Sequence, residues 1–268
     1  MDRVDLHAHT CFSDGSDEPA LLLEKAKRIG LRAVAITDHD CTDGLSVIPP
    51  EGLELVPGVE LNVTADEREI HVLGYFIDPM KLDIREQMER DREIRNQRIL
   101  NLLRREGVEI TLAELRAGKP VGNLGRPQIA DALVKRGLFP DRSSAFRAWL
   151  AEGKPYYVRR SYLSPEEACA LIRTAGGRAV LAHPMQYKLT DDALRALVRR
   201  CREAGFSGLE VRYTGYGPEV QDMLFRLAEE YGLCPTGGSD YHGDHRPENP
   251  LGGTDVPYAW LEALRETN

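Results

Sequence analysis

Val4-Asp5-Leu6-His7-Ala8-His9 is the stretch that decides the fold, because a short apolar strand runs directly into two histidines. Thr10-Cys11-Phe12-Ser13-Asp14 continues the stretch as a loop. Histidines at positions i and i+2, where a strand becomes a loop, can turn both imidazoles toward one point beyond the strand end. A His-x-His pair also occurs as ordinary surface histidine, so its interpretation depends on where the other histidines lie.

Other histidines repeat this arrangement, with an apolar run before them and a carboxylate beside them. His39 closes the run from Ala33 to Asp38, His183 follows Ala179-Val180-Leu181-Ala182, and His242 follows Gly238-Ser239-Asp240. Histidine and carboxylate, with no cysteine at ligand spacing, favour a divalent ion such as Mn, Zn or Fe over a thiolate-bound zinc. The sequence therefore predicts a divalent metal centre.

Glu60 and His71 lie in two apolar runs, Val59–Val63 and Ile70–Gly74, that flank the polar turn Thr64–Arg68. If the runs pair as an antiparallel hairpin, residues 60 and 71 fall roughly opposite each other and share a face. A carboxylate and an imidazole then meet the same cavity. The alternative is a cross-strand salt bridge on a solvated face, which needs no metal.

Composition predicts one large α/β domain with a small insert, since the chain has 268 residues, 42% of them hydrophobic and 29% charged. No apolar stretch reaches the length of a membrane span, and the N-terminal residues show no signal-peptide core. The five cysteines form no Cys-x-x-Cys pair, as is typical of a reducing compartment. We therefore expect a cytoplasmic protein without membrane contact.

The formal net charge of -8 argues against a broad nucleic-acid surface and so against long duplex partners. It does not exclude a phosphate substrate. Asp14, Glu60 and Asp240 would be neutralised locally by two or three divalent ions, which would then dominate the field that an anion meets.

Strand and helix patterns alternate along most of the chain, which is the order of elements expected for a β/α barrel with one hairpin. Helix starts are indicated by Pro19, Pro218, Thr190 and the capping box Ser164–Glu167. Most metal-type residues follow strands, where such barrels carry their active sites. The seven predicted strands are Arg3–Leu6, Ala33–Thr37, Glu54–Val63, Glu69–Ile77, Arg178–Ala182, Gly208–Arg212 and Cys234–Gly237.

The alternation of strands and helices stops between residues 79 and 155. The patterns in this segment predict helices over 81–105, 127–136 and 143–150, and a capping box at Thr111–Glu114. We expect a first barrel segment at 1–78, a helical insert at 79–155 near the active-site rim, and a second barrel segment at 156–268. Arg92, Arg95 and Arg98 recur at helical spacing and are interpreted as a solvated face, with contact to the substrate as the alternative. Arg126, before a helix-starting proline, is the better candidate for substrate phosphate, and Lys154 is a weaker one.

The ordered motifs resemble those of the PHP (polymerase and histidinol phosphatase) superfamily along nearly the whole chain. This resemblance implies a distorted seven-stranded β/α barrel with a two- or three-metal site. Within the superfamily, the chain looks most like phosphoesterases that remove the 3′-phosphate from nucleoside 3′,5′-bisphosphates, whose relatives also trim short RNAs from the 5′ end. The motifs are His7-Ala8-His9, Asp14-Gly15, Thr37-Asp38-His39-Asp40, Gly58-Val59-Glu60, His71, Ala182-His183-Pro184 and Gly238-Ser239-Asp240-Tyr241-His242.

The resemblance also implies how the ligands are divided among the metals. One metal would be held by His7, His9, Glu60 and Asp240; a second by Glu60, His71 and His183; and a third by Asp14, His39 and His242. Asp38 and Asp40 are expected to orient imidazoles, as carboxylates beside metal-binding histidines do, and we count Asp40 among the catalytic residues on that ground.

This ligand set predicts hydrolysis of a nucleotide phosphate ester by a hydroxide that bridges two divalent ions. The leaving oxygen would receive its proton from His183, His242 or metal-bound water. Two alternatives stay open. The chain could be a phosphatase of a small metabolite such as histidinol phosphate, or a metal-binding interaction module without catalysis.

Overall fold

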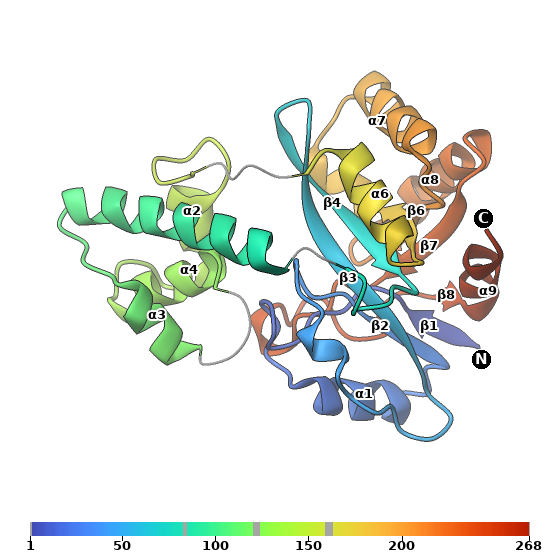
Figure 1. Ribbon diagram of the computed structural model, residues 1–268, viewed down its shortest axis with the longest axis horizontal. Coiled ribbons are helices and arrows are strands. Elements are labelled where there is room, and N and C mark those ends of the chain that lie inside the picture. The colour runs from blue at the N-terminus through green and yellow to red at the C-terminus, as the bar shows by residue number, and fades with distance from the viewer. Residues whose placement is uncertain (1, 83–84, 120–123, 159–162, 268) are drawn as a thin grey trace. The chain divides into compact units, whose positions relative to one another are not determined.

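The computed structural model describes residues 2–82, 85–119, 124–158 and 163–267, and in these ranges eight strands form one sheet (Figure 1). The order across the sheet is β7-β6-β5-β4-β3-β2-β1-β8. The strands are β1 (Arg3–Asp5), β2 (Ala33–Ile36), β3 (Glu54–Ala65), β4 (Arg68–Tyr75), β5 (Arg178–Leu181), β6 (Gly208–Tyr213), β7 (Cys234–Gly238) and β8 (Val256–Pro257).

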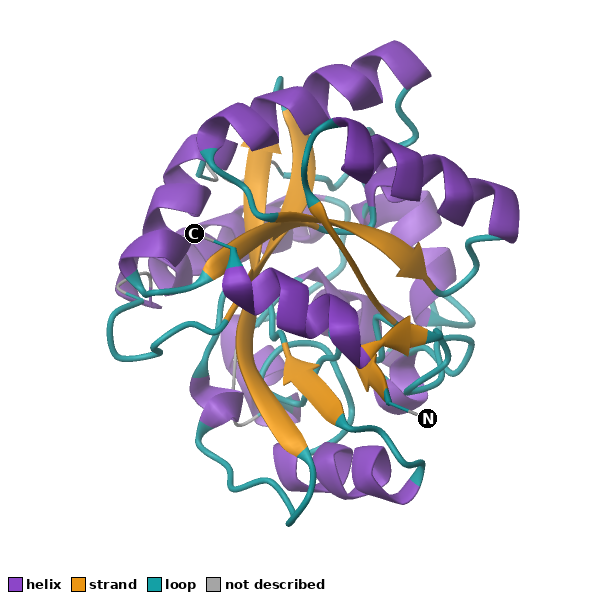
Figure 2. Cartoon of the chain, turned by 90° about the vertical axis from the view of Figure 1, so that its right-hand side faces the viewer, coloured by secondary structure: helices purple, strands orange, loops and turns teal. Residues whose placement is uncertain are grey.

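Helices flank this sheet, and Figure 2 shows them around the strands. Their starts agree with the sequence signals, because α1 begins at Pro19, α6 follows the Ser164 cap, α7 follows Thr190 and α8 begins at Pro218. The helices of the barrel are α1 (Pro19–Arg28), α6 (Pro165–Thr174), α7 (Asp191–Ala204), α8 (Pro218–Glu230) and α9 (Tyr258–Glu266), with short turns η1 (Asp43–Leu45), η3 (Pro184–Tyr187) and η4 (Gly243–His245).

The sheet closes almost completely into a barrel. Neighbours are parallel from β1 to β3 and from β5 to β7, whereas β4 is antiparallel to both β3 and β5. At the seam between β1 and β7, the Leu6 N–H donates to the Gly237 carbonyl (3.2 Å), and Ala8 bridges Tyr241 just beyond. The carboxyl ends of β1 and β7 are thereby brought side by side.

The predicted number of strands, seven, is too low by one, because the described residues form a sheet of eight strands. All seven predicted strands are present, with ends shifted by two residues or fewer, but β8 adds an eighth, antiparallel to β1 through Arg3–Pro257 and Val4–Val256. A strand of two residues that contains a proline has no alternating pattern to recognise, so tertiary pairing alone creates it.

Apolar side chains fill the barrel and fix the approach of its strands. Tyr75 is fully buried and its hydroxyl donates to the Leu6 carbonyl at 2.8 Å. Gly238 is required at the seam, because a Cβ there would collide with the backbone nitrogen and Cβ of His7. The core cluster contains Val4, Leu6, Ala33, Ala35, Val56, Leu73, Tyr75, Val180, Ala182, Val256, Tyr258, Leu261 and Leu264.

A second compact unit spans Ile84–Ser161, and the barrel unit consists of Met1–Asp83 and Tyr162–Asn268. The second unit has its own apolar core, in which Ile99, Leu103, Ile129 and Leu133 are fully buried. Residues 83 and 84, which the sequence patterns assign to the first insert helix, lie outside the described residues. The elements of this unit are α2 (Arg85–Arg105), α3 (Leu112–Gly118), α4 (Arg126–Lys135), α5 (Arg142–Ala145) and the π-helical turn η2 (Phe146–Leu150).

Two features of the insert differ from the sequence interpretation. The capping box at Thr111 is half formed, because the Glu114 N–H donates to the Thr111 hydroxyl (3.1 Å) while the Glu114 carboxylate pairs with Arg136 instead. Arg98 is exposed as expected, but Arg92 and Arg95 are buried, so their solvated-face interpretation is wrong. That side of α2 packs near the start of α4, where the neighbouring Asn96 amide donates to the Leu124 carbonyl at 3.0 Å.

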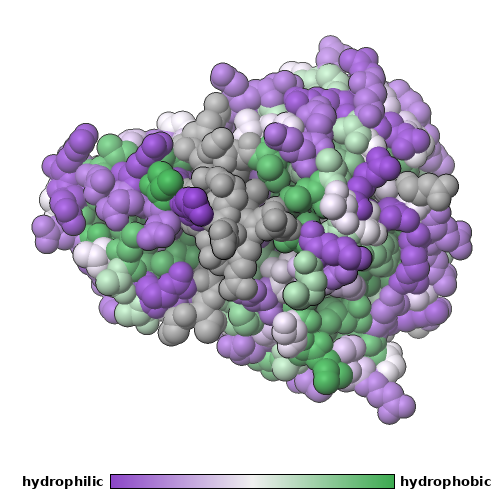
Figure 3. Space-filling model, viewed as in Figure 1, coloured by the Kyte–Doolittle hydropathy of each residue, from purple (hydrophilic) through white to green (hydrophobic). Residues whose placement is uncertain are grey.

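Hydrophilic residues cover much of the visible surface, with smaller hydrophobic areas between them (Figure 3). None of the described helices combines the length and the apolar character that crossing a bilayer requires.

Candidate metal centre

All nine predicted ligands lie in the barrel unit, at or near the carboxyl ends of strands or on the β3–β4 hairpin. The sheet order makes these positions converge even though they are far apart in sequence. β1 and the loop after it supply His7, His9 and Asp14; β2 is followed by His39; the hairpin carries Glu60 and His71; and β5 and β7 are followed by His183, Asp240 and His242.

Glu60 lies at the middle of this group and is 1% exposed. Its Oε1 is 2.9 Å from both His71 Nδ1 and His183 Nε2. Its Oε2 is 3.3 Å from His7 Nε2, 3.2 Å from His9 Nε2 and 3.2 Å from His39 Nδ1. One carboxylate thus faces five imidazoles, which suits it to bridge two cations. The solvated salt-bridge alternative is wrong for this residue because Glu60 is buried.

The hairpin register differs from the prediction, because Glu60 and His71 do not lie directly opposite each other. Glu60 lies opposite Leu73, and His71 lies opposite Asn62, so Glu60 and His71 are diagonal neighbours. The turn is the two residues Asp66-Glu67, both with positive φ, and this tight turn sets the register. Because diagonal neighbours two apart still share a face, the expected contact forms all the same.

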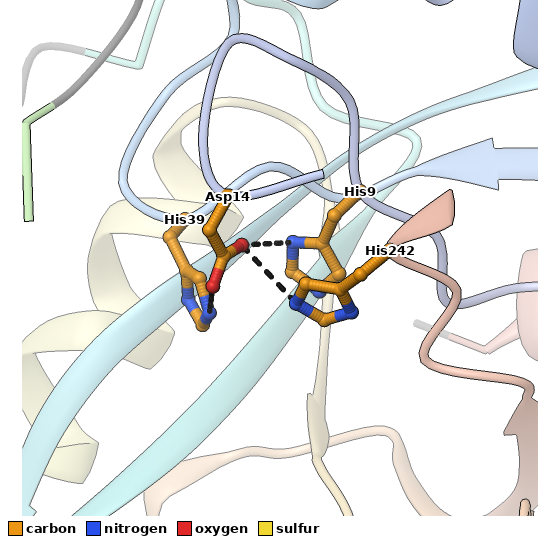
Figure 4. A group of neighbouring side chains, drawn as sticks. All are labelled: His9, Asp14, His39 and His242. Atoms are coloured by element: carbon orange, nitrogen blue, oxygen red, sulfur yellow. Dashed lines mark ion pairs between the residues drawn. The ribbon is translucent and has the colours of Figure 1, made fainter. Parts of the chain in front are cut away.

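Asp14 organises a second part of the cluster, in which it lies between His39 and the pair His9 and His242 (Figure 4). Its Oδ1 is 3.1 Å from His242 Nε2 and 3.7 Å from His9 Nδ1, and its Oδ2 is 3.9 Å from His39 Nε2. Asp240 joins the two parts, since its Oδ1 is 3.2 Å from His9 Nε2 and 3.5 Å from His7 Nε2.

The donor atoms fit divalent ions. Among the described residues, no hydrogen-bond partner satisfies the buried atoms His7 Nε2, His9 Nε2 and Glu60 Oε2, or His242 Nε2 and Asp14 Oδ1. An ion with ligands at about 2.1 Å would separate neighbouring ligand atoms by about 3.0–3.4 Å, close to the spacings found here. Three groups have ligand atoms within 4.8 Å of one another: His9, Asp14, His39 and His242; His7, His9 and Glu60; and His39, Glu60 and His71.

His9 and His39 each belong to two of these groups. The division of ligands among three metals that the sequence suggests therefore stays a prediction, because a shared imidazole can be assigned either way. The structure places all nine residues in one cluster without choosing between the assignments.

Electrostatics within the cluster favours charged carboxylates beside protonated His9 and His71. Burial alone would raise the pKa of Glu60, but the imidazoles of His39 and His71 hold it well below its ordinary value. Burial likewise opposes protonation of His9 and His71, yet neighbouring carboxylates raise the pKa of His9 to about 9 and that of His71 to about 10. Protonation is not shared by all the imidazoles, because burial lowers the pKa of His39 to about 3 and also lowers the pKa of His242.

Asp38 and Asp40 have different partners. Asp38 accepts hydrogen bonds from the Thr10 N–H (2.8 Å) and from the Ser13 hydroxyl, whose oxygen lies 3.3 Å from His9 Nδ1. It therefore acts on an imidazole through Ser13. Asp40 accepts from the backbone N–H and the side-chain amide of Asn62, at 3.0 and 2.7 Å. Its catalytic role stays a prediction.

Sequence reasoning missed Glu210, which lies in β6 and is fully buried. Its Oε1 is 3.1 Å from His7 Nδ1, and its Oε2 accepts the His183 N–H at 2.6 Å. One carboxylate thus fixes the ring of one predicted ligand and the backbone of another. The available signal was a charged residue in the otherwise apolar run Gly208-Leu209-Glu210-Val211, where only a partnered carboxylate is tolerated.

Arg246 and Tyr213 were also missed. The Tyr213 hydroxyl and Arg246 Nη1 both donate to Asp240 Oδ2, each at 2.7 Å. Asp240 and His183 have positive φ angles of 55° and 20°, which non-glycine residues adopt at a cost and keep where surrounding contacts hold them. Side-chain donors to Asp240 and the Glu210 carboxylate at His183 are such contacts.

Arg126 and Lys154, the predicted substrate-binding residues, lie in the other unit. Arg126 begins α4, its Nη1 donates to the Leu150 carbonyl at 3.4 Å, and its guanidinium carbon is 5.3 Å from the ring centroid of Tyr157. Lys154 is exposed. Their substrate-binding role stays a prediction.

Comparison with known proteins agrees with the site. The PHP domain family model matches residues 5–132. The chain is 32% identical to the 5′-3′ exoribonuclease Rnm of Escherichia coli K12 over 89% of this chain and 84% of the relative. It is 31% identical to a 3′,5′-nucleoside bisphosphate phosphatase of Chromobacterium violaceum, covering 96% and 93% of the two chains. A solved structure from Bifidobacterium adolescentis, assigned as a metal-dependent phosphoesterase, superposes with a TM-score of 0.86 at 32% identity, over 100% of this chain and 97% of that one.

Proposed function

The chain belongs to the PHP domain family, and from this premise we propose that it removes the 3′-phosphate from nucleoside 3′,5′-bisphosphates. It is a metal-dependent phosphoesterase, as its relatives are hydrolases of phosphate esters. The observation that carries the finer proposal is the convergence of nine imidazole and carboxylate side chains at one end of the barrel, in a chain similar to a bisphosphate phosphatase along nearly its whole length.

The donor set suits two or three divalent ions among Mn, Zn and Fe, because imidazole nitrogen and carboxylate oxygen are their common ligands. His7, His9, Glu60 and Asp240 would hold one ion, and Asp14, His39 and His242 would hold another. Such ions would supply Lewis-acid activation of the phosphoryl group and of the attacking water.

The protein residues supply orientation and protons. Glu210 keeps the Nδ1 proton of His7 on the side away from the cluster, so that Nε2 faces the ligands of the centre. For the proton that the leaving oxygen needs, we favour His183 over His242. Each has one ring nitrogen that no described residue satisfies, Nδ1 in His183 and Nε2 in His242. His242 Nε2 faces Asp14 Oδ1 at 3.1 Å, as a metal-binding atom would, whereas His183 faces Glu60 through Nε2 at 2.9 Å and leaves Nδ1 for a proton.

A second candidate function is removal of nucleotides from short RNA, which is favoured by the likeness to a 5′-3′ exoribonuclease. Both reactions are hydrolytic attack on phosphorus beside a ribose, so one site can serve both. The formal charge of -8 argues for mononucleotides and RNAs of a few residues over long polyanions.

The test is a turnover comparison with Mn²⁺-loaded protein on adenosine 3′,5′-bisphosphate, a short 5′-phosphorylated RNA and histidinol phosphate. We expect the bisphosphate to yield adenosine 5′-monophosphate and one inorganic phosphate with the highest kcat/KM. A higher kcat/KM on histidinol phosphate would replace this proposal by the metabolite phosphatase. Absence of turnover on all three, with metal bound, would favour the non-catalytic module.

A further inference from the structure

Arg246 follows the turn η4 and connects the metal centre with solvent. Its backbone is fixed on both sides, since its N–H donates to the Gly243 carbonyl (3.3 Å) and its own carbonyl accepts from the Asn249 N–H (3.0 Å). Its Nη1 donates to Asp240 Oδ2 at 2.7 Å. Asp240 is 4% exposed, whereas the Arg246 side chain is 42% exposed. The guanidinium therefore reaches from a buried ligand to the surface.

The two oxygens of Asp240 have separate partners. Oδ1 faces the imidazoles of His7 and His9, as a metal ligand would. Oδ2 accepts from Arg246 and from Tyr213 on its other side. An arginine guanidinium stays protonated at any physiological pH. The group is thus a permanent cation beside the anionic cluster.

A guanidinium has five N–H donors in a plane, which suits it to bind phosphate oxygens. Among the described residues, the Asp240 bond through Nη1 is the side-chain hydrogen bond of Arg246, and its other N–H groups have no acceptor. Tyr213 makes the same contact to Oδ2 but is 7% exposed and carries a single donor. Of the two residues that hold Asp240, Arg246 alone has donors left for an incoming anion.

We propose that Arg246 binds the phosphoryl group at the metal centre, with Nη1 holding Asp240 and the remaining N–H groups donating to a phosphate oxygen. This inference rests on the proposed function and adds to it a substrate contact on the barrel itself, in the unit that carries the ligands. The same contact would hold the inorganic phosphate that hydrolysis releases.

The test compares Arg246→Gln with Tyr213→Phe, because each removes one hydrogen bond to the same Asp240 oxygen. Calorimetric titration of metal-free protein with Mn²⁺ measures the Mn²⁺ affinity, which depends on how well Asp240 is held in position as a ligand. Titration of Mn²⁺-loaded protein with inorganic phosphate reports on the anion contact without any need for turnover. Arg246→Lys keeps the charge and tests whether the cation restores binding.

We expect both substitutions to weaken Mn²⁺ binding by similar factors, and Arg246→Gln alone to weaken phosphate binding, by roughly 10- to 100-fold. Arg246→Lys should recover part of that loss. An unchanged phosphate Kd in Arg246→Gln would overturn the proposal. So would an equal loss in Tyr213→Phe, because the effect would then act through Asp240.

These outcomes separate the inference from the proposed function. Mn²⁺-loaded protein that binds phosphate through Arg246 but cleaves no nucleotide would overturn the nucleotide phosphatase and leave the anion contact standing. Wild-type protein that binds none of Mn²⁺, Zn²⁺ and Fe²⁺ would overturn both.

Discussion

Replacing Glu210 by glutamine should weaken Mn²⁺ binding while leaving the barrel folded. The carboxylate accepts two buried hydrogen bonds, from His7 Nδ1 at 3.1 Å and from the His183 N–H at 2.6 Å. A glutamine of the same shape offers one oxygen acceptor and one NH₂ group. Whichever way the amide turns, one of the two donors meets the NH₂ group.

The magnitude follows from what each orientation does. If the NH₂ group faces His7, Nδ1 must accept, and its proton moves to Nε2, the nitrogen that faces Glu60 and Asp240. If it faces His183, the backbone that holds this residue at φ 20° loses its acceptor. Loss of a buried hydrogen bond to a charged group costs roughly 1.5–3 kcal/mol. That corresponds to a drop in metal affinity of about 10- to 100-fold, as is typical of residues that orient metal-binding histidines.

Calorimetric titration of chelator-stripped protein with Mn²⁺ measures the effect directly. Glu219→Gln, the same substitution at an exposed position at the start of α8, is the matched control and should leave the affinity unchanged. Near-ultraviolet circular dichroism of the metal-free proteins checks that the barrel is intact. Wild-type Mn²⁺ affinity in a folded Glu210→Gln protein would refute the argument that this carboxylate sets the ligand geometry.

Three further expectations test the metal dependence, the insert and the substrate range. Exhaustive chelation should abolish turnover, and Mn²⁺ should restore it. Asp240→Asn and His9→Ala should each lower kcat by orders of magnitude while the fold is retained. Wild-type kcat in either variant would contradict the ligand assignment. Arg126→Ala should raise KM for a nucleoside bisphosphate by roughly 10- to 100-fold, because a lost charge-assisted contact costs about 1.5–3 kcal/mol; an equal rise for an aryl monophosphate would instead indicate a folding role. Excess long duplex RNA at physiological salt should compete poorly with a labelled short substrate, since a chain of formal charge -8 offers a polyanion little beyond the centre; strong competition would reveal an extended basic groove.

The residues that converge in the cluster could be predicted because their chemistry is carried by local sequence. His7 and His9 sit where an apolar run ends, and His183 and Asp240 repeat the pattern, so residue type and position at a strand end both point to the barrel mouth. The helix starts could also be predicted, because a capping residue such as Ser164 accepts a hydrogen bond from a backbone N–H in the first turn of the same helix.

What could not be predicted depends on contacts between distant segments. Glu210 acquires its role only because β6 lies beside β5 and its side chain reaches His7 across the barrel. Arg246 acquires its role only because the turn η4 brings its guanidinium within hydrogen-bond distance of Asp240. The burial of Arg92 and Arg95 arises from packing in the insert, which charge periodicity along one helix cannot reveal. Residues that act through a partner carry no signature of their own in a single sequence.

The position of the centre across the seam between β1 and β7 also determines when it can come into existence during synthesis. A ribosome releases His7 and His9 first among the ligands and Asp240 and His242 last. At roughly 5–20 residues per second, a nascent chain carries its first imidazoles for about ten seconds or longer before β7 and the Asp240 and His242 that follow it are synthesised. During that time His7 and His9 offer an incomplete set of ligands to any ion that binds imidazole. The complete set of nine potential ligands therefore exists only after β7 and the residues that follow it have been synthesised.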